Sequence, residues 1–149
     1  MDQRKLVVMI AEDDPDLRWL YQHWLASAGW HVRLVDDGAW VLALIPPDPP
    51  DLLLLDLNLP AVDGFKVCRS LKNDPDLKRI PILAMTSQSD TVTRDHALAV
   101  GADGFLVKPF SRTELVMQIE KLLGVDRERP DTDPQLHVVM GQALSRAGS

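Results

Sequence analysis

Short apolar runs alternate with amphipathic segments along the first 123 residues of the chain. The first run, Leu6–Ala11, is continuous and contains β-branched residues, which is typical of a strand buried on both faces of a sheet. Asp14 and Pro15 then pair a helix cap with a proline at the first helical position, and leucines recur at helical spacing until Gly29. The chain therefore opens with a strand followed by a helix.

The same alternation repeats four more times. Further strands are predicted at 30–35, 52–55, 80–86 and 104–107, and further helices at 38–45, 64–73, 90–100 and 111–123. Five strand and helix pairs predict an α/β fold, a doubly wound (βα)5 parallel sheet with right-handed crossovers and helices on both faces. In such folds the functional site lies at the carboxyl ends of the strands.

Polar residues stand where these strands end. Glu12 and Asp13 follow the first strand and Asp56 the third, while Thr86 ends the fourth and Lys108 follows the fifth. Three carboxylates brought together repel one another unless cations offset their charge. Lys108 supplies one cation, and Mg²⁺ suits a site made of oxygen ligands.

The plausible Mg²⁺ ligands are Asp13, Asp56 and a backbone carbonyl near Asn58. A carboxylate at such a site can attack phosphorus and form an acyl phosphate. Phosphoryl transfer needs in-line positioning and neutralisation of the phosphoryl oxygens, which Mg²⁺, Lys108 and the Thr86 hydroxyl can provide. Asp56 is the candidate phosphoacceptor.

Four segments of the chain together resemble the receiver domains of response regulators in two-component signalling, the family that includes chemotaxis regulators. They are residues 11–14 (AEDD), 54–60 with Asp63 and Gly64 (LLDLNLP…DG), 84–87 (AMTS) and 101–110 (GADGFLVKPF). Each lies at a different strand end and they occur in the family's order, so the combination is far more specific than any one segment. The resemblance covers residues 5 to 123.

The resemblance implies a flavodoxin-like fold and a role for each matching residue. Asp56 becomes the phosphoacceptor, Glu12 and Asp13 the acidic pair, Thr86 and Lys108 the groups that contact the phosphoryl group, and Phe105 the switch aromatic. It further implies a cis peptide bond between Lys108 and Pro109. The donor would be a histidine kinase or a histidine phosphotransfer protein, and the output partner would bind the surface of the fourth helix, fifth strand and fifth helix.

Three positions depart from the family's commonest pattern. Glu12 stands where aspartate is frequent, Ser87 where alanine or glycine is usual, and Phe105 where tyrosine is common. The longer Glu12 should reach the metal through water, and Phe105 has no hydroxyl for an inward hydrogen bond. Asn58 and Gln88, two residues beyond Asp56 and Thr86, are placed to influence the access of water and hence the lifetime of the phosphoryl group.

Two other functions compete with a phosphorylated receiver. A receiver-like adaptor that binds partners without phosphorylation would be expected to lose the acidic pair or the lysine, and both are intact here. A metal-dependent hydrolase would turn over phosphate esters. An aspartate-based phosphatase of the haloacid dehalogenase type would want a second acid two residues after Asp56, where Asn58 stands.

The composition limits which partners the chain is expected to bind and in which cellular compartment it is expected to lie. The 149 residues carry a formal net charge of −6, which argues against direct binding to nucleic acid. The lone cysteine, Cys68, fits a reducing compartment such as the cytoplasm. The N-terminal apolar run is too short for a membrane span, so we expect no membrane segment.

The composition changes after Leu123. Residues 124–130 form a charged linker, and an apolar stripe at helical spacing between 133 and 144 predicts a short amphipathic helix. The receiver itself, a second copy of the chain in a homodimer, or another protein could cover that stripe. We therefore divide the chain into a receiver domain, 1–123, and a tail, 124–149.

Overall fold

The computed structural model describes residues 5–125, which form five strands and five helices in strict alternation. The strands are β1 (Val7–Ala11), β2 (His31–Val35), β3 (Leu52–Asp56), β4 (Ile82–Thr86) and β5 (Gly104–Val107). The helices are α1 (Pro15–Ser27), α2 (Gly38–Leu44), α3 (Gly64–Lys72), α4 (Thr91–Ala99) and α5 (Arg112–Leu123). The predicted tail helix lies outside these residues.

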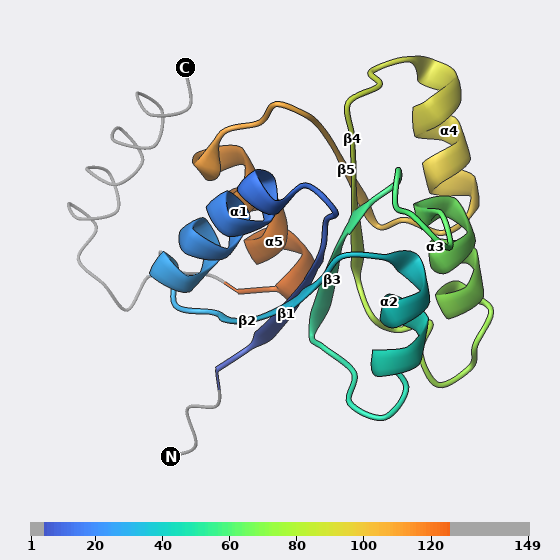
Figure 1. The fold of residues 1–149 in the computed structure, drawn as a ribbon, viewed down its shortest axis with the longest axis horizontal. Helices are drawn as coiled ribbons and strands as arrows, with labels where there is room; N and C mark the ends of the chain where they lie inside the picture. Colours follow the sequence, from blue (N-terminus) through green and yellow to red (C-terminus); the bar gives the residue numbers. More distant parts are fainter. Residues whose placement is uncertain (1–4, 126–149) are drawn as a thin grey trace.

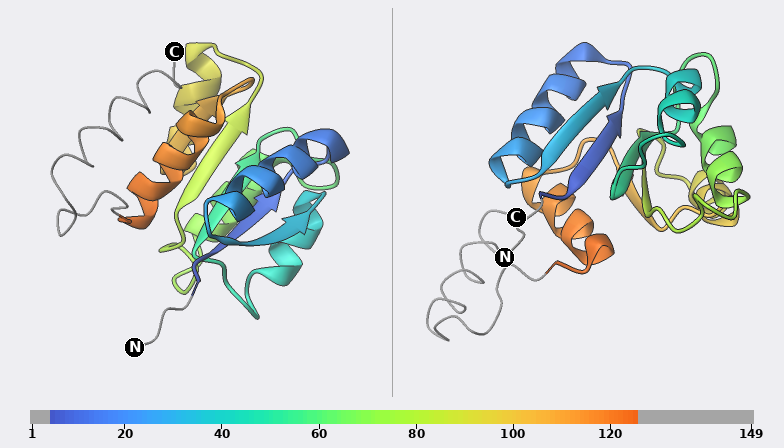
Figure 2. Two further views of the ribbon diagram at one scale, coloured as in Figure 1. Left: turned by 90° about the vertical axis from the view of Figure 1, so that its left-hand side faces the viewer. Right: turned by 90° about the horizontal axis from the view of Figure 1, so that it is seen from below.

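All five strands are parallel and form one sheet in the order β2-β1-β3-β4-β5. Helices α1 and α5 cover one face of the sheet, and α2, α3 and α4 cover the other (Figures 1 and 2). The predicted doubly wound (βα)5 sheet is confirmed. No helix within residues 5–125 is long and apolar enough to cross a lipid bilayer.

Each face of the sheet has its own hydrophobic core. Tyr21 and Leu25 of α1 pack with Leu115 and Ile119 of α5 against one face. Val41, Val67 and Ala97 bring α2, α3 and α4 onto the other. Because β3 is covered on both sides, its four leucines are fully buried, and this strand carries Asp56 to the edge of the core.

Each of the five described helices is preceded by a residue whose side chain accepts a hydrogen bond from the backbone of the first helical turn. The caps are Asp14, Asp37, Asp63, Asp90 and Ser111. Such caps satisfy backbone N–H groups that would otherwise lack an intrahelical partner. Because these helices follow the strands, their capped ends lie at the same edge of the sheet as the strand ends.

The element boundaries differ from the predicted ones by one or two residues. The predicted helices at 90–100 and 111–123 included their caps, Asp90 and Ser111. Strand β4 was predicted from Ile80 and begins at Ile82. Pro81 has no N–H to give to a strand ladder, and the N–H of Ile80 closes the preceding turn by donating to Leu77 O at 3.0 Å.

Candidate functional site

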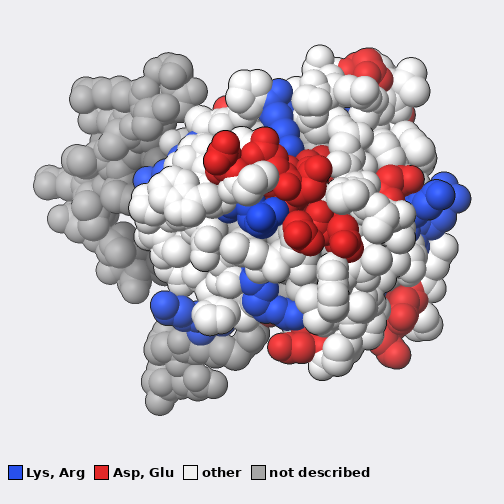
Figure 3. Space-filling model, viewed as in Figure 1, with Lys and Arg blue, Asp and Glu red and all other residues white. Residues whose placement is uncertain are grey.

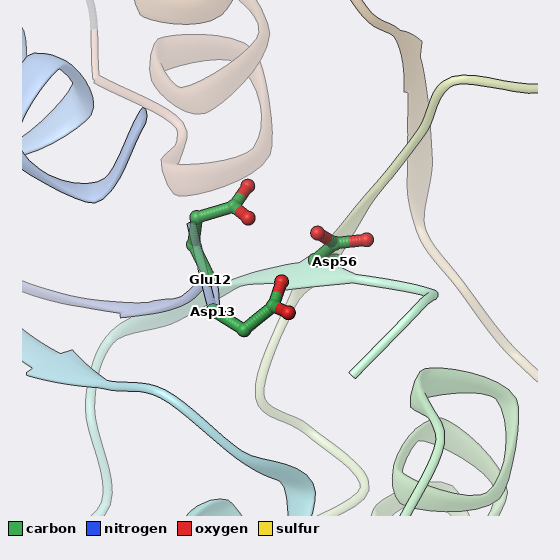
Figure 4. Close-up of side chains that lie close together, drawn as sticks. All are labelled: Glu12, Asp13 and Asp56. Atoms are coloured by element: carbon green, nitrogen blue, oxygen red, sulfur yellow. The ribbon is translucent and has the colours of Figure 1, made fainter. Parts of the chain in front are cut away.

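Three carboxylates from two neighbouring strands meet at the carboxyl edge of the sheet. Glu12 and Asp13 follow the end of β1, and Asp56 is the last residue of β3. One carboxylate oxygen of each lies within 4.8 Å of the others (Figure 4). Glu12 and Asp56 are buried, with 1% and 4% of their surfaces exposed, whereas Asp13 is exposed. The predicted acidic residues therefore do converge.

Lys108 joins two of these carboxylates. Its Nζ donates to Glu12 Oε1 at 2.6 Å and to Asp56 Oδ2 at 2.9 Å. The Lys108 backbone N–H donates to Thr86 O at 2.7 Å, and the peptide bond to Pro109 is cis, as the resemblance implied. Burial alone would lower the pKa of Lys108, but its hydrogen bonds to Glu12 and Asp56 outweigh burial and raise the pKa above its ordinary value.

The charges at this edge are not balanced by one ammonium group. Burial raises the pKa of Glu12 from 4.5 to about 7; the hydrogen bond from Lys108 opposes that shift, and the nearby charge of Asp56 adds to it. Glu12 is thus poorly stabilised as an anion even though its carboxylate accepts a hydrogen bond from Lys108. An all-oxygen cluster with excess negative charge fits a divalent cation such as Mg²⁺.

The loop after β3 holds the Asp56 carboxylate from its other side. Asp56 Oδ1 accepts a hydrogen bond from the Asn58 backbone N–H at 2.9 Å. The Gly64 N–H donates to Leu57 O at 3.0 Å, and a Cβ on Gly64 would lie 2.5 Å from both Asp56 O and Leu57 Cα. The close packing of this loop around Asp56 therefore requires glycine at position 64.

Thr86 and Phe105 lie on the adjacent strands β4 and β5. Thr86 is buried, and its hydroxyl oxygen accepts a hydrogen bond from the Gln88 backbone N–H at 3.1 Å. Phe105 pairs with Ala84 across the sheet and is partly buried against the core formed with α2, α3 and α4. Thr86 thus ends β4, with its hydroxyl oxygen bonded within the following turn, whereas Phe105 is the second residue of β5 and lies two residues before the end of that strand.

Sequence reasoning missed Arg18 of α1. Its Nη1 donates to Glu12 O at 2.8 Å and lies 3.5 Å from Asp13 O. The available signal was its position: helical side chains lean toward the N-terminus of their helix, so a long cation one turn into α1 can reach back to the end of β1.

Acidic side chains dominate the surface around these strand ends. Figure 3 shows them gathered over the carboxyl edge of the sheet, with few basic groups between them. The helix caps Asp14, Asp37 and Asp63 add to the carboxylates of the site itself. Such a surface attracts divalent cations and repels small anions.

Comparisons with known proteins agree with this geometry. The model of the response regulator receiver domain family matches residues 8–120. The transcriptional regulatory protein BaeR of Escherichia coli O6:H1 is 35% identical over 123 residues, which are 83% of this chain and 50% of BaeR. The chain spans about half the length of the curated relatives it matches.

Solved structures show the same fold. A crystal structure assigned to the response regulators, from Chloroflexus aurantiacus J-10-fl, is 31% identical with a TM-score of 0.79 and covers 81% of this chain and 99% of its own. The receiver domain of sensor histidine kinase PA1611 from Pseudomonas aeruginosa PAO1 is 29% identical with a TM-score of 0.76 and the same coverage. That receiver holds a magnesium ion in its active-site cleft.

Proposed function

This chain belongs to the response regulator receiver domain family, and from that premise we propose that Asp56 is its phosphoacceptor. Receivers of two-component systems are phosphorylated on aspartate by histidine kinases. One observation carries the assignment to Asp56: its buried carboxylate ends the central strand, contacts Lys108, and lies beside two further carboxylates. A carboxylate in that setting is a nucleophile with its counter-charges in place.

Mg²⁺ is the proposed cofactor. Asp13, Asp56 and the Asn58 backbone carbonyl would hold it, and Glu12 would reach it through water. Bound there, Mg²⁺ would neutralise charge on the oxygens of the incoming phosphoryl group. The magnesium in the PA1611 receiver supports this choice of metal.

In the proposed reaction a carboxylate oxygen of Asp56 attacks the phosphorus of a phosphohistidine. The new O–P bond forms as the P–N bond breaks, and the electron pair leaves with the imidazole nitrogen, which then takes a proton from solvent. Lys108 and the Thr86 hydroxyl contact the phosphoryl oxygens. Water later attacks the same phosphorus and releases phosphate, so the receiver promotes only its own phosphorylation and dephosphorylation.

The aspartyl phosphate acts as a switch. Its charge draws the Thr86 hydroxyl away from the Gln88 N–H and lets Phe105 turn inward. The equilibrium between two arrangements of the surface of α4, β5 and α5 then shifts, and the output partner binds there. Transcriptional regulation is the output named for the longer relatives, while this acidic receiver makes no direct contact with nucleic acid.

The donor is a histidine kinase or a histidine phosphotransfer protein in a phosphorelay. We propose residues 1–123 as the receiver domain; the linker and helix predicted for 124–149 lie almost wholly outside the described residues. The lone cysteine is consistent with a reducing cytoplasm.

Phosphorylation by a small-molecule donor tests the proposal. The native chain is incubated with acetyl phosphate and Mg²⁺, and its intact mass is measured before and after hydroxylamine treatment. We expect one phosphoryl adduct that hydroxylamine removes, because it cleaves acyl phosphates. The adduct should be absent in Asp56→Asn and present in Asp63→Asn, since Asp63 only caps α3. No adduct on the native chain, or an undiminished adduct on Asp56→Asn, would overturn the assignment.

A further inference from the structure

The Asp13 carboxylate has no hydrogen bond from any other described residue, 5–125, and its side chain is exposed. Its position relative to Asp56 is therefore set by the two peptide groups on either side of Asp13. Both of these peptide groups are held. Asp14 N–H donates to Glu12 Oε2 at 3.1 Å, which fixes the peptide after Asp13.

Arg18 holds the peptide group before Asp13. Its Nη1 donates to the Glu12 carbonyl oxygen at 2.8 Å and stands 3.5 Å from the Asp13 carbonyl oxygen. The Arg18 backbone N–H also donates to Asp14 O at 2.9 Å, within the first turn of α1. The guanidinium group thus joins the helix to the end of β1 and fixes the plane of the peptide that links Glu12 to Asp13.

Two effects of Arg18 on a bound cation oppose each other. The positive guanidinium lies close to the acidic cluster, so its charge alone weakens binding of Mg²⁺. Its hydrogen bond to Glu12 O orders the turn that carries Asp13, which strengthens binding. Because the two effects change Mg²⁺ affinity in opposite directions, removal of the guanidinium group shows which of them is larger.

We infer that Arg18 is a positioning residue for the metal site, whose hydrogen bond to the Glu12 carbonyl holds Asp13 in place to bind Mg²⁺ despite the repulsion between the two cations. The inference rests on the proposed function, because it takes Asp13 as a metal ligand. A carboxylate on a rigid turn loses less freedom when it binds a cation than one on a mobile turn. Under this inference the ordering effect of Arg18 exceeds its electrostatic effect.

Calorimetric titration with Mg²⁺ tests this role. We expect Arg18→Met to weaken Mg²⁺ binding by about tenfold, in the range found for residues that orient metal ligands. Arg18→Lys keeps the charge and loses the planar fork, so it should weaken binding too. At saturating Mg²⁺ the rate of phosphorylation by acetyl phosphate should return to the native value, because the loss lies in metal affinity alone.

Arg33→Met is the matched control. Arg33 Nη1 donates to the Asp48 carbonyl oxygen at 2.6 Å, so this change also removes a guanidinium bonded to a main-chain carbonyl, but outside the site. Its Mg²⁺ affinity should equal that of the native chain. Thermal unfolding in EDTA confirms that each variant is folded, and Arg18→Lys decides the question if Arg18→Met does not fold.

The outcomes separate the two proposals. Native or tighter Mg²⁺ binding by Arg18→Met and Arg18→Lys would overturn the role of Arg18 and leave the metal site intact. If the native chain bound no Mg²⁺, or Asp13→Asn bound it equally well, the metal site itself would be wrong.

Discussion

Two lysines with nearly the same exposure have different bonding partners and different roles in this fold. The side chains of Lys72 and Lys108 are 16% and 15% exposed. Lys72 Nζ donates to Asp103 Oδ2 at 2.8 Å and to the carbonyl oxygens of Lys78 and Ile80, both at 2.9 Å. Lys108 Nζ donates instead to the two carboxylates Glu12 and Asp56.

The difference lies in the balance of charge around each ammonium group. Lys72 faces one carboxylate and two neutral carbonyls, and Asp103 Oδ2 also accepts from the Ile82 N–H at 2.8 Å. One cation and one anion therefore balance each other in this closed group, which links α3 to β4 and to the residue before β5. Lys108 faces two buried carboxyl groups with Asp13 beside them. A closed group stabilises the fold, whereas an unbalanced one is ready to take up a cation and a phosphoryl group.

The largest predicted effect concerns catalysis. Lys108→Met removes a cation from the transferring phosphoryl group, so we expect the initial rate of phosphorylation at saturating Mg²⁺ to fall by roughly 100- to 1,000-fold. Lys72→Met should stay within about twofold of the native rate, because Lys72 is outside the site. Acetyl phosphate labelling followed by intact mass measures both. An equal fall in the phosphorylation rate of the two variants would show that Lys108 has no greater role in phosphoryl transfer than Lys72.

The second prediction concerns the contribution of Lys72 to stability. Lys72→Met leaves the partly exposed Asp103 carboxylate without its cation and two carbonyls without their donor, so the free energy of unfolding should fall by about 2 kcal/mol. Urea denaturation at pH 7 measures it. Lys66→Met is the control, because Lys66 lies exposed on the same helix and its loss should cost under about 0.5 kcal/mol. A similar small loss in Lys72→Met would contradict the structural role.

The strand ends could be predicted from the sequence because they depend on local patterns. The leucines of β3 are apolar without interruption, so a strand buried on both faces was the natural prediction, and Asp56 had to stand at its carboxyl end. The order of parallel strands then brings Glu12, Thr86 and Lys108 to the same edge. Chain connectivity and apolar pattern determine these features.

The bonds among these side chains could not be predicted in the same way. Lys108 is 96 residues from Glu12 in sequence, and the reach of both side chains decides that they bond directly. The place of Arg18 in the first turn of α1 lets it reach the end of β1, but the sequence does not tell which oxygen there it bonds. The bond between Lys72 and Asp103 likewise joins residues 31 positions apart in the sequence. The bonding partners of long, flexible side chains can be identified only from the folded structure.

The third prediction concerns the pH dependence of stability without metal. The pKa of Glu12 is about 7 in the folded chain and 4.5 as its ordinary value, so the folded chain holds this proton more tightly. Its contribution to stability is complete below pH 4.5 and is lost as the pH rises to 7.

Glu12→Gln should remove this loss. Relative to the native chain, the variant should gain about 2 kcal/mol in free energy of unfolding between pH 5 and pH 8. Urea denaturation in EDTA at both pH values measures the difference, and Lys72→Met should keep the native pH slope. Parallel profiles for Glu12→Gln and the native chain would mean that Glu12 is charged across this range.

The smallest predicted effect is stabilisation by Mg²⁺ itself. A ligand at five times its Kd adds about 1 kcal/mol to the free energy of unfolding. We expect this increment in the native chain and in Lys72→Met, and none in Asp13→Asn, when thermal unfolding is followed with and without Mg²⁺. The increment should be larger at pH 8 than at pH 6, because a proton on Glu12 reduces the negative charge that attracts the cation. An increment independent of pH would mean that the charge of Glu12 does not affect Mg²⁺ binding and that Glu12 interacts with Lys108 only.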